Sequence, residues 1–308
     1  MLNILYGFIV PIGLALSMLG MGLTLSMRDF AAVVTQPRAM VIGMIGQLLL
    51  LPAAACLVAI VFPLDPAIAA GLIILGACPG GITSNSLVYL ARADAALSVA
   101  LTSVSSLLAG ITMPLTVTFA FDAVLGLTAQ GIRLPFRSTA VQILLITAVP
   151  VIAGMSLRAL AASLTSWLEP ALRRFTVVLL AVIMAGALVV EFDFFSRNLP
   201  VAGPLCLLLC AGMMLVGWAL SRVAGLARPQ AFSIATEVGL QNGALGAFVA
   251  LTLLREPKFV VVPSIYTIVM LLAGSIFVVI YRHKTSRWAA PAVAAPAARA
   301  RAERSVNW

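Results

Sequence analysis

The segment 67–90 reads AIAAGLIILGACPGGITSNSLVYL, an apolar run that is interrupted by proline, glycine and then polar side chains. About 20 apolar residues are enough for a helix to cross the hydrocarbon core of a bilayer. Pro79 lacks the backbone N–H that a continuous helix needs, and Gly80 and Gly81 permit an unwound backbone. The segment therefore predicts a membrane-spanning helix that is broken near its middle.

A second apolar run, 230–254, is interrupted in a comparable way by EVGLQNG, which starts at Glu237. Of the ten acidic residues, Glu237 is the one that lies well inside an apolar run. A carboxylate at that depth costs at least about 2.5–3.5 kcal/mol unless it is compensated, which favours a functional site. The alternative is a protonated structural glutamate that bonds to a neighbouring helix. Two interrupted helices, one in each half of the chain, are typical of a transporter binding site.

Similar apolar runs recur along nearly the whole chain of 308 residues. Hydrophobic residues make up 62% of it and charged residues 9%, whereas soluble domains have roughly 25% charged residues. We therefore predict an all-α polytopic membrane protein with about nine transmembrane helices. The predicted spans are 3–25, 38–62, 67–90, 95–120, 137–161, 175–195, 199–223, 230–254 and 260–281. Among the joints expected between them are 167–174 and 191–200.

The basic residues behind the net charge of +9 lie mostly at the joints and in the C-terminal segment 282–308, which holds six of the nineteen. This is the positive-inside pattern of membrane proteins, so no nucleic-acid partner is expected. With the N-terminus outside, 14 basic residues fall inside and 5 outside, which favours a cytoplasmic C-terminus. Residues 1–288 would form the transmembrane domain and 289–308 a disordered, basic cytoplasmic tail. No cleavable signal peptide is expected, so 3–25 is the first retained span.

Residues that would support catalysis or a transition-metal site are sparse in the predicted spans. The four cysteines lie in apolar runs and are interpreted as small hydrophobic residues; they are Cys56, Cys78, Cys206 and Cys210. His283 is the only histidine and lies in the C-terminal segment 282–308, beyond the last predicted span. An intramembrane enzyme would need a nucleophile with a base, or paired aspartates, within the spans, and neither is visible. We therefore do not expect an enzyme.

Oxygen-bearing side chains gather around the two interruptions. Ser84 and Asn85 follow the first one, and Ser98 and Thr102 lie four residues apart on one face of the next helix. Gln47 is the one strongly polar residue deep in the second span. Amide, hydroxyl, carbonyl and carboxylate oxygens suit a hard cation, whereas zinc or copper sites use clustered histidine or cysteine.

The motifs at these positions resemble those of the bile acid:sodium symporter family. The matching strings are GMGLTL at 20–25, ACPGG at 77–81 with SN at 84–85, YLAR at 89–92 with ALS at 96–98, and EVG at 237–239 with QN at 241–242. The resemblance covers essentially the whole membrane portion. It implies an inverted-repeat core domain with two crossed discontinuous helices, which moves against a panel domain. The core would comprise 38–120 and 199–281, and the panel 3–25 and 137–195.

The resemblance also implies a division of the candidate residues into two sodium sites and a substrate site. One sodium site would use Ser84, Asn85, Ser98, Thr102 and Glu237. The other would use Gln47, Glu237, Gln241 and the backbone carbonyls of Val238 and Leu240. Asn242 and the backbone around Ile82 and Thr83 would face the substrate. Two Na⁺ would then act as coupling ions.

The function that this resemblance implies is sodium-coupled symport of an organic anion by alternating access in a bacterial inner membrane. Bile-acid-like molecules or small carboxylates such as pantoate or a keto acid are the expected substrates. A proton-coupled or uncoupled carrier of the same fold is the alternative. Ile82 and the apolar pair Leu271-Leu272 depart from the family's pattern, which bears on the substrate. The nine spans resemble the animal members, whereas bacterial members often have ten.

Overall fold

The computed structural model describes residues 5–126 and 135–288, and every regular element within them is a helix. The all-α class is therefore confirmed for these residues, while the predicted tail at 289–308 lies outside them. The longer helices are α2 (Val10–Thr24), α8 (Ala95–Ala123), α9 (Phe136–Leu160), α10 (Ala162–Val190), α11 (Phe192–Val223) and α14 (Val261–Trp288). The shorter ones are α3 (Ala31–Thr35), α4 (Pro37–Ile45), α5 (Leu51–Val61), α6 (Pro66–Gly76), α7 (Ile82–Ala91), α12 (Arg228–Gly239) and α13 (Gly243–Phe248).

Seven helical stretches of the described residues are long and apolar enough to cross a membrane. Each lies at one of the nine predicted spans, and they are Gly7–Thr24, Pro37–Val61, Ala95–Ala123, Phe136–Leu160, Phe192–Val223, Arg228–Leu253 and Pro257–Thr285. Two shorter apolar helices, Pro66–Gly76 and Ala181–Val190, lie at the other two predicted spans. The chain is therefore a multi-pass membrane protein.

One of the predicted joints is wrong, and a second is longer than the break in the structure. The joint expected at 167–174 lies inside α10, and most of the joint expected at 191–200 lies inside α11. Helices α9 and α10 are separated instead at Ala161, and α10 and α11 are separated at Glu191, the first residue of the joint expected at 191–200. With 29 residues, α10 is about 44 Å long, which exceeds the roughly 30 Å of the hydrocarbon core. Charged residues and Pro170 can therefore occupy helical turns near one end of α10 without breaking it.

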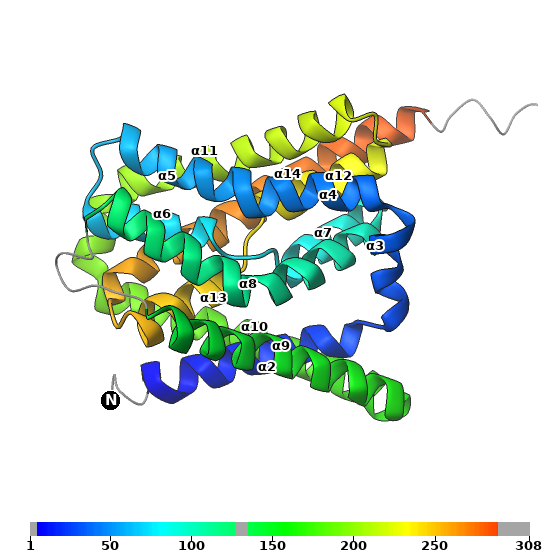
Figure 1. The fold of residues 1–308 in the computed structure, drawn as a ribbon, viewed down its shortest axis with the longest axis horizontal. Coiled ribbons are helices and arrows are strands. Elements are labelled where there is room, and N and C mark those ends of the chain that lie inside the picture. The colour runs from blue at the N-terminus through cyan, green and yellow to red at the C-terminus, as the bar shows by residue number, and fades with distance from the viewer. Residues whose placement is uncertain (1–4, 127–134, 289–308) are drawn as a thin grey trace, which may run out of the picture.

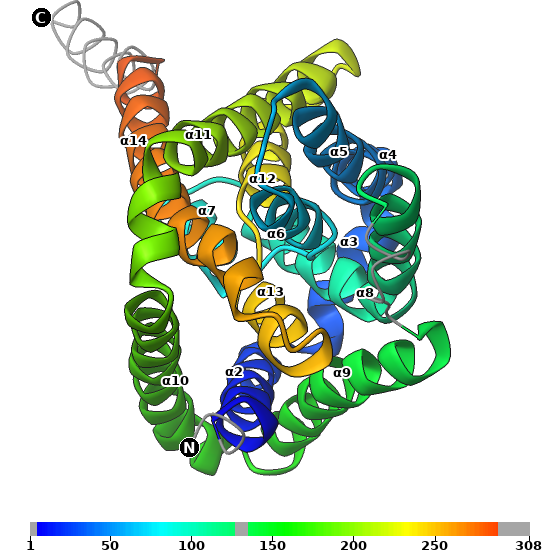
Figure 2. The same cartoon turned by 90° about the vertical axis from the view of Figure 1, so that its left-hand side faces the viewer.

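Three helices, α2, α9 and α10, form a layer along one side of the molecule (Figures 1 and 2). Glycines permit their close approach. A Cβ on Gly22 would overlap the backbone carbonyl of Val151 in α9, and Gly13 faces Leu179 of α10. Small residues at such contacts let membrane helices pack with their backbones close together. We refer to α2, α9 and α10 as the three-helix layer.

The remaining helices surround the two predicted interruptions. In Figure 2, α6 and α12 lie in the middle, with α11 above them and the three-helix layer below. A Cβ on Gly43 of α4 would lie 2.6 Å from Leu101 of α8, and one on Gly46 would lie 2.7 Å from Val238 of α12. The absence of a side chain at Gly43 and Gly46 therefore lets α4 and the turn after it pack close to α8 and α12, which carry predicted ion ligands.

Candidate functional site

The first predicted interruption is present between α6 and α7, which are separated by residues 77–81. Gly80 leaves space for Glu237, because a Cβ at this position would overlap the Glu237 carboxylate and displace it. Gly81 has an extended backbone, with φ −144° and ψ −178°, and has no side chain with which to cap α7. The first N–H groups of α7 therefore need other partners.

The second predicted interruption is present between α12 and α13. Leu240 is extended, with φ −110° and ψ 118°. Asn242 is the N-cap residue of α13, and its side-chain oxygen accepts a hydrogen bond from the N–H of Leu245 at 3.1 Å. At the end of α12, the hydroxyl of the fully buried Tyr266 donates to the carbonyl of Gly239 at 2.7 Å. This bond satisfies a helix-terminal carbonyl that has no access to water.

The two interruptions meet in the interior of the molecule. The backbone N–H of Asn242 donates to the carbonyl of Pro79 at 2.9 Å. A Cβ on Gly81 would lie in ordinary contact with Asn242, 3.7 Å from its Cα. Unwound backbone at membrane depth is tolerated only where protein groups or a water-filled cavity satisfy it. The interruptions 77–81 and 240–242 thus satisfy each other in part, and we call the place where they meet the crossing.

The carboxylate of Glu237 lies at the crossing among hydroxyl groups from α7 and α8. Thr102 donates to its Oε1 at 2.5 Å, and Ser84 donates to its Oε2 at 2.7 Å. Ser98 lies 3.4 Å from Oε2 and donates to Oδ1 of Asn85 at 2.7 Å. Glu237 is only 1% exposed. The structure therefore brings together all five residues that were predicted for the first sodium site.

Asn85 and Glu237 present acceptor oxygens to the same hydroxyl groups. The hydroxyl of Thr102 lies 3.2 Å from Oδ1 of Asn85 and is also bonded to Glu237. Serine and threonine hydroxyls can rotate to present a lone pair in place of a proton. The cluster thus offers one carboxylate, one amide oxygen and three hydroxyls, which is the ligand chemistry of a hard cation.

A second polar cluster joins the π-helical turn Gly46–Leu50, between α4 and α5, to the end of α12. Gln47 in this turn is buried and donates to the side-chain oxygen of Gln241 at 2.7 Å and to the carbonyl of Cys78 at 2.9 Å. Gln241 in turn donates to the carbonyl of Val238 at 2.8 Å. π-Helical turns within α-helices occur frequently at functional sites. The structure therefore places Gln47 and Gln241 together, beside the segment that contains Leu240.

The residues predicted to face a substrate lie at the starts of α7 and α13. Ile82 and Thr83 form the first turn of α7 and are half-buried, and Asn242 is 8% exposed. The side-chain oxygen of Asn242 caps α13, which the sequence pattern did not predict. Any substitution of Asn242 therefore affects the local helix as well as the space in front of it.

Three groups at the crossing were not predicted from the sequence: the hydroxyl of Tyr266 and the carbonyls of Cys78 and Pro79. Tyr266 carried a signal, because a tyrosine inside an apolar span needs a partner for its O–H. The two carbonyls carried no such signal in the sequence, because every residue has a carbonyl. Only the packing of distant segments decides which carbonyl accepts a hydrogen bond.

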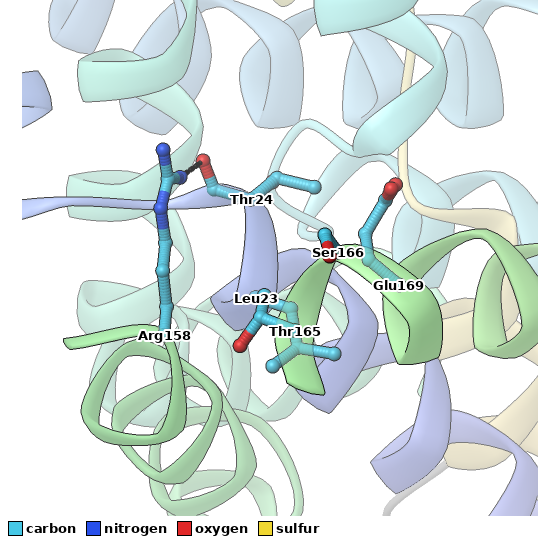
Figure 3. A pocket seen from close by; sticks show the side chains of 6 residues that line it. All are labelled: Leu23, Thr24, Arg158, Thr165, Ser166 and Glu169. Carbon is cyan, nitrogen blue, oxygen red and sulfur yellow. Dashed lines mark hydrogen bonds between the residues drawn. The ribbon is translucent and has the colours of Figure 1, made fainter. Parts of the chain in front are cut away.

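A cavity of about 470 Å³ lies at the ends of α2 and α9 and the start of α10 (Figure 3). It is lined by Leu23, Thr24, Arg158, Thr165, Ser166 and Glu169. The guanidinium of Arg158 donates to the carbonyl of Thr24, at the C-terminal end of α2, where positive charge is favourable. All of the lining residues belong to the three-helix layer and none to the crossing, so this cavity is separate from the candidate site.

Comparison with known proteins gives a consistent result. A family model described as the sodium bile acid symporter family matches residues 11–198. The uncharacterized sodium-dependent transporter YocS of Bacillus subtilis is 31% identical over 282 residues, which cover 90% of this chain and 84% of that protein.

Two eukaryotic relatives are similar over the same part of the chain. The probable chloroplastic sodium/metabolite cotransporter BASS1 of Arabidopsis thaliana is 30% identical over 277 residues, covering 90% of this chain and 67% of the relative. The human ileal sodium/bile acid cotransporter is 29% identical over 291 residues, covering 91% of this chain and 80% of the relative. The chain thus spans about two thirds of the length of the plant relative.

Proposed function

The chain belongs to the sodium bile acid symporter family, and we propose that it couples inward movement of an organic anion to that of two sodium ions. The observation that carries this proposal is the cluster of oxygen ligands around Glu237 at the crossing of two broken helices. Discontinuous helices that meet near the bilayer midplane are where secondary transporters bind substrate and coupling ions.

The first sodium ion would bind between Glu237 and Asn85, with Ser84, Ser98 and Thr102 completing the site. Hydroxyl protons now separate the acceptor oxygens of Glu237 and Asn85. A cation can take over this role, because it attracts both acceptors while the hydroxyls rotate to present lone pairs. Because Glu237 is almost fully buried, a bound cation would strongly stabilise its negative charge.

The second sodium ion would bind at the cluster of Gln47 and Gln241. Its ligands would be the side-chain oxygens of these residues, the carbonyls of Val238 and Leu240, and the far side of the Glu237 carboxylate. The support for this site is the short distance between Gln47 and Gln241 and the unwound backbone at Leu240. Unwound carbonyls at a helix break are suitable cation ligands.

The organic anion would bind in front of Ile82, Thr83 and Asn242. The uncapped start of α7 supports this assignment, because free N–H groups and the helix dipole at an N-terminus favour an anion. The apolar side chain of Ile82 suits a substrate with a hydrophobic part. The relatives' names mention bile acids and metabolites, so the substrate class proposed is a bile-acid-like molecule or a small carboxylate such as pantoate or a keto acid.

Alternating access would arise from movement of a core, 38–120 and 199–281, against a panel of 3–25 and 137–195, with nine spans and an inverted repeat in all. Contacts between the three-helix layer and the helices around the crossing involve α8, α13 and α14, and Met184 of α10 packs 3.6 Å from the position of a Cβ on Gly243. By contrast, α7 and α12 have few contacts with this layer. With the N-terminus outside a bacterial inner membrane, this arrangement corresponds to a state closed toward the outside.

The proposed stoichiometry makes transport electrogenic. Two cations against one Glu237 carboxylate leave the loaded site with an excess charge of +1, which a monoanionic substrate neutralises. Each turnover then moves one net positive charge inward. A tenfold sodium gradient supplies about 1.4 kcal/mol per ion, and 100 mV supplies about 2.3 kcal/mol. Together this is about 5 kcal/mol, enough for accumulation of the anion by several thousandfold.

The test is uptake of a bile acid, pantoate and a keto acid into proteoliposomes, with the membrane potential clamped by potassium and valinomycin. We expect uptake of at least one of these anions to require external sodium and to increase with an inside-negative potential. Replacement of sodium by choline is expected to abolish it, with a sodium Hill coefficient above one. Uptake that continues in choline and follows a pH gradient would instead identify a proton-coupled carrier.

A further inference from the structure

The starts of three helices that carry the proposed ion ligands are joined by side chains at one end of the molecule. Gln36 precedes α4, Asp94 precedes α8, and Gln230 lies in the first turn of α12. Gln36 donates to the carboxylate of Asp94 at 3.0 Å, and Gln230 donates to the side-chain oxygen of Gln36 at 2.8 Å. Ser233 of α12 donates to the backbone carbonyl of Asp94 at 2.8 Å. We call these four residues the clasp.

The clasp lies one helical turn from the Glu237 cluster. Asp94 comes four residues before Ser98 at the start of α8, and Ser233 comes four residues before Glu237 on α12. Four residues of α-helix span about 6 Å. The contact between Ser233 and Asp94 therefore joins the same two helices as the contacts of Glu237 with Ser98 and Thr102. A shift of α12 along α8 would disturb both sets of contacts together.

The third helix, α4, is tied to this unit by packing as well as by the clasp. Gly43 lies against Leu101 of α8, and Gly46 lies against Val238 of α12. Gln47, a proposed ligand of the second ion, follows directly after Gly46. The clasp thus links the starts of α4, α8 and α12, and residues in these helices or directly after them supply ligands to the two proposed sodium sites, together with Ser84 and Asn85 of α7.

Gln36 differs from the other three residues of the clasp because its side chain makes no hydrogen bond to the helix that it precedes. It occupies the N-cap position of α4 but makes no capping hydrogen bond. Asp94, in contrast, uses Oδ1 to cap α8 through the N–H of Leu97 at 3.0 Å, and Gln230 accepts the N–H of Ala227 at 3.0 Å. Loss of the Gln36 amide would therefore break the links of α4 to α8 and α12, while the bond of Ser233 to Asp94 remains and no helix is uncapped.

We propose that the clasp holds α4, α8 and α12 in register and that Gln36 is a positioning residue for sodium binding. This inference rests on the proposed sodium coupling. Without the Gln36 amide, the arrangement that can bind ions is populated for a smaller fraction of the time, and the apparent dissociation constant for sodium rises in inverse proportion to that fraction. The proposed substrate residues belong to α7 and α13, which the clasp does not join, so the KM for substrate at saturating sodium stays the same.

The test compares two variants with a neighbouring control. Gln36→Leu removes the amide at similar size, and Gln36→Glu places a second carboxylate against Asp94. The control, Thr35→Ala, removes a hydroxyl that bonds to the carbonyl of Ala31 within its own short helix. The purified full chain is titrated with sodium chloride in place of choline chloride at constant ionic strength. The sodium concentration that gives half of the maximal rise in unfolding temperature is measured, together with half-saturating sodium and substrate KM in proteoliposomes.

Gln36→Leu removes two hydrogen bonds of a partly exposed side chain and is expected to raise half-saturating sodium by about threefold to tenfold. Gln36→Glu is expected to raise it at least as much, and Thr35→Ala by less than about twofold. Substrate KM at saturating sodium is expected to change by less than about twofold in all three. Because Gln36 is half-exposed, Gln36→Glu carries the same test should the leucine variant not fold.

A lower unfolding temperature with unchanged half-saturating sodium would overturn the proposal, since Gln36 would then be a structural residue only. A parallel rise in substrate KM at saturating sodium would also overturn it, because the effect would not be confined to ion binding. If the wild-type chain itself shows no dependence on sodium, the proposed coupling fails first, and this outcome is distinct from the other two.

Discussion

The two interrupted helices reach a similar broken geometry with different residues. The first interruption, 77–81, is made by proline and glycine and has no capping side chain at the start of α7. The second, 240–242, contains neither residue type and ends in Asn242, which caps α13. Charge is also divided unequally: Glu237 precedes the second interruption, whereas neutral Ser84 and Asn85 follow the first.

This difference indicates that the two halves of the crossing, 77–81 and 240–242 with their flanking residues, contribute different features to the candidate site. The first half supplies a backbone shape and neutral oxygens, and it leaves space for the carboxylate that the second half supplies. Substitutions in the first half should therefore act through space, and those in the second half through charge and capping. The predictions below test this division, from the largest expected effect to the smallest.

Glu237→Gln is expected to lower sodium-driven uptake by at least about a hundredfold, because both ions lose their only carboxylate. Removing one partner of a buried charge interaction typically costs about 3–5 kcal/mol. The measurement is initial uptake in proteoliposomes, with Glu191→Gln as control, since Glu191 lies between α10 and α11 and makes no capping bond. Near-normal sodium-driven uptake by a folded Glu237→Gln protein would remove this residue from the proposed mechanism.

Gly80→Ala is expected to reduce sodium-driven uptake by more than about tenfold, whereas Gly81→Ala should stay within about twofold of the wild type. A Cβ at Gly80 overlaps the Glu237 carboxylate, and forced overpacking costs about 1–3 kcal/mol. A Cβ at Gly81 meets Asn242 at ordinary contact distance on an extended backbone that any residue can adopt. Half-saturating sodium is the deciding measurement, and equal effects of the two substitutions would contradict the idea that Gly80 makes room for the charge.

Asn242→Asp and Asn242→Ser form a smaller test of the second half. Both residues are good N-caps, so the start of α13 should be kept. The aspartate places a negative charge in front of the anion and should weaken substrate binding by about tenfold, while the serine loses only the amide and should weaken it about threefold. Binding of substrate and of sodium is measured separately by thermal shift. Loss of sodium affinity with unchanged substrate affinity would assign Asn242 to an ion site instead.

Composition and local sequence pattern were enough to predict the all-α membrane class, the two interruptions and Glu237 as a candidate site residue. The apolar runs predicted an all-α membrane protein, because about 20 apolar residues in a row have no stable place in water. The first interruption was visible because proline and glycine act on the backbone where they stand, and the second because a polar stretch between two glycines breaks an apolar run. Glu237 stood out because a charge at membrane depth is costly. Each of these inferences depends on a residue and its immediate neighbours.

Only the tertiary structure decided which distant groups meet. Ser84 and Thr102 reach Glu237 from 153 and 135 residues away, and Gln36 reaches Gln230 across 194. The joint at Ala161 was also misplaced and the joint at Glu191 was predicted too long, because charged residues and proline occur in helical turns beyond the apolar segment. The hydrogen bond from the Tyr266 hydroxyl to the Gly239 carbonyl depends on how α14 packs against α12. Packing of this kind is set by the joint fit of many side chains, which no single stretch of sequence contains.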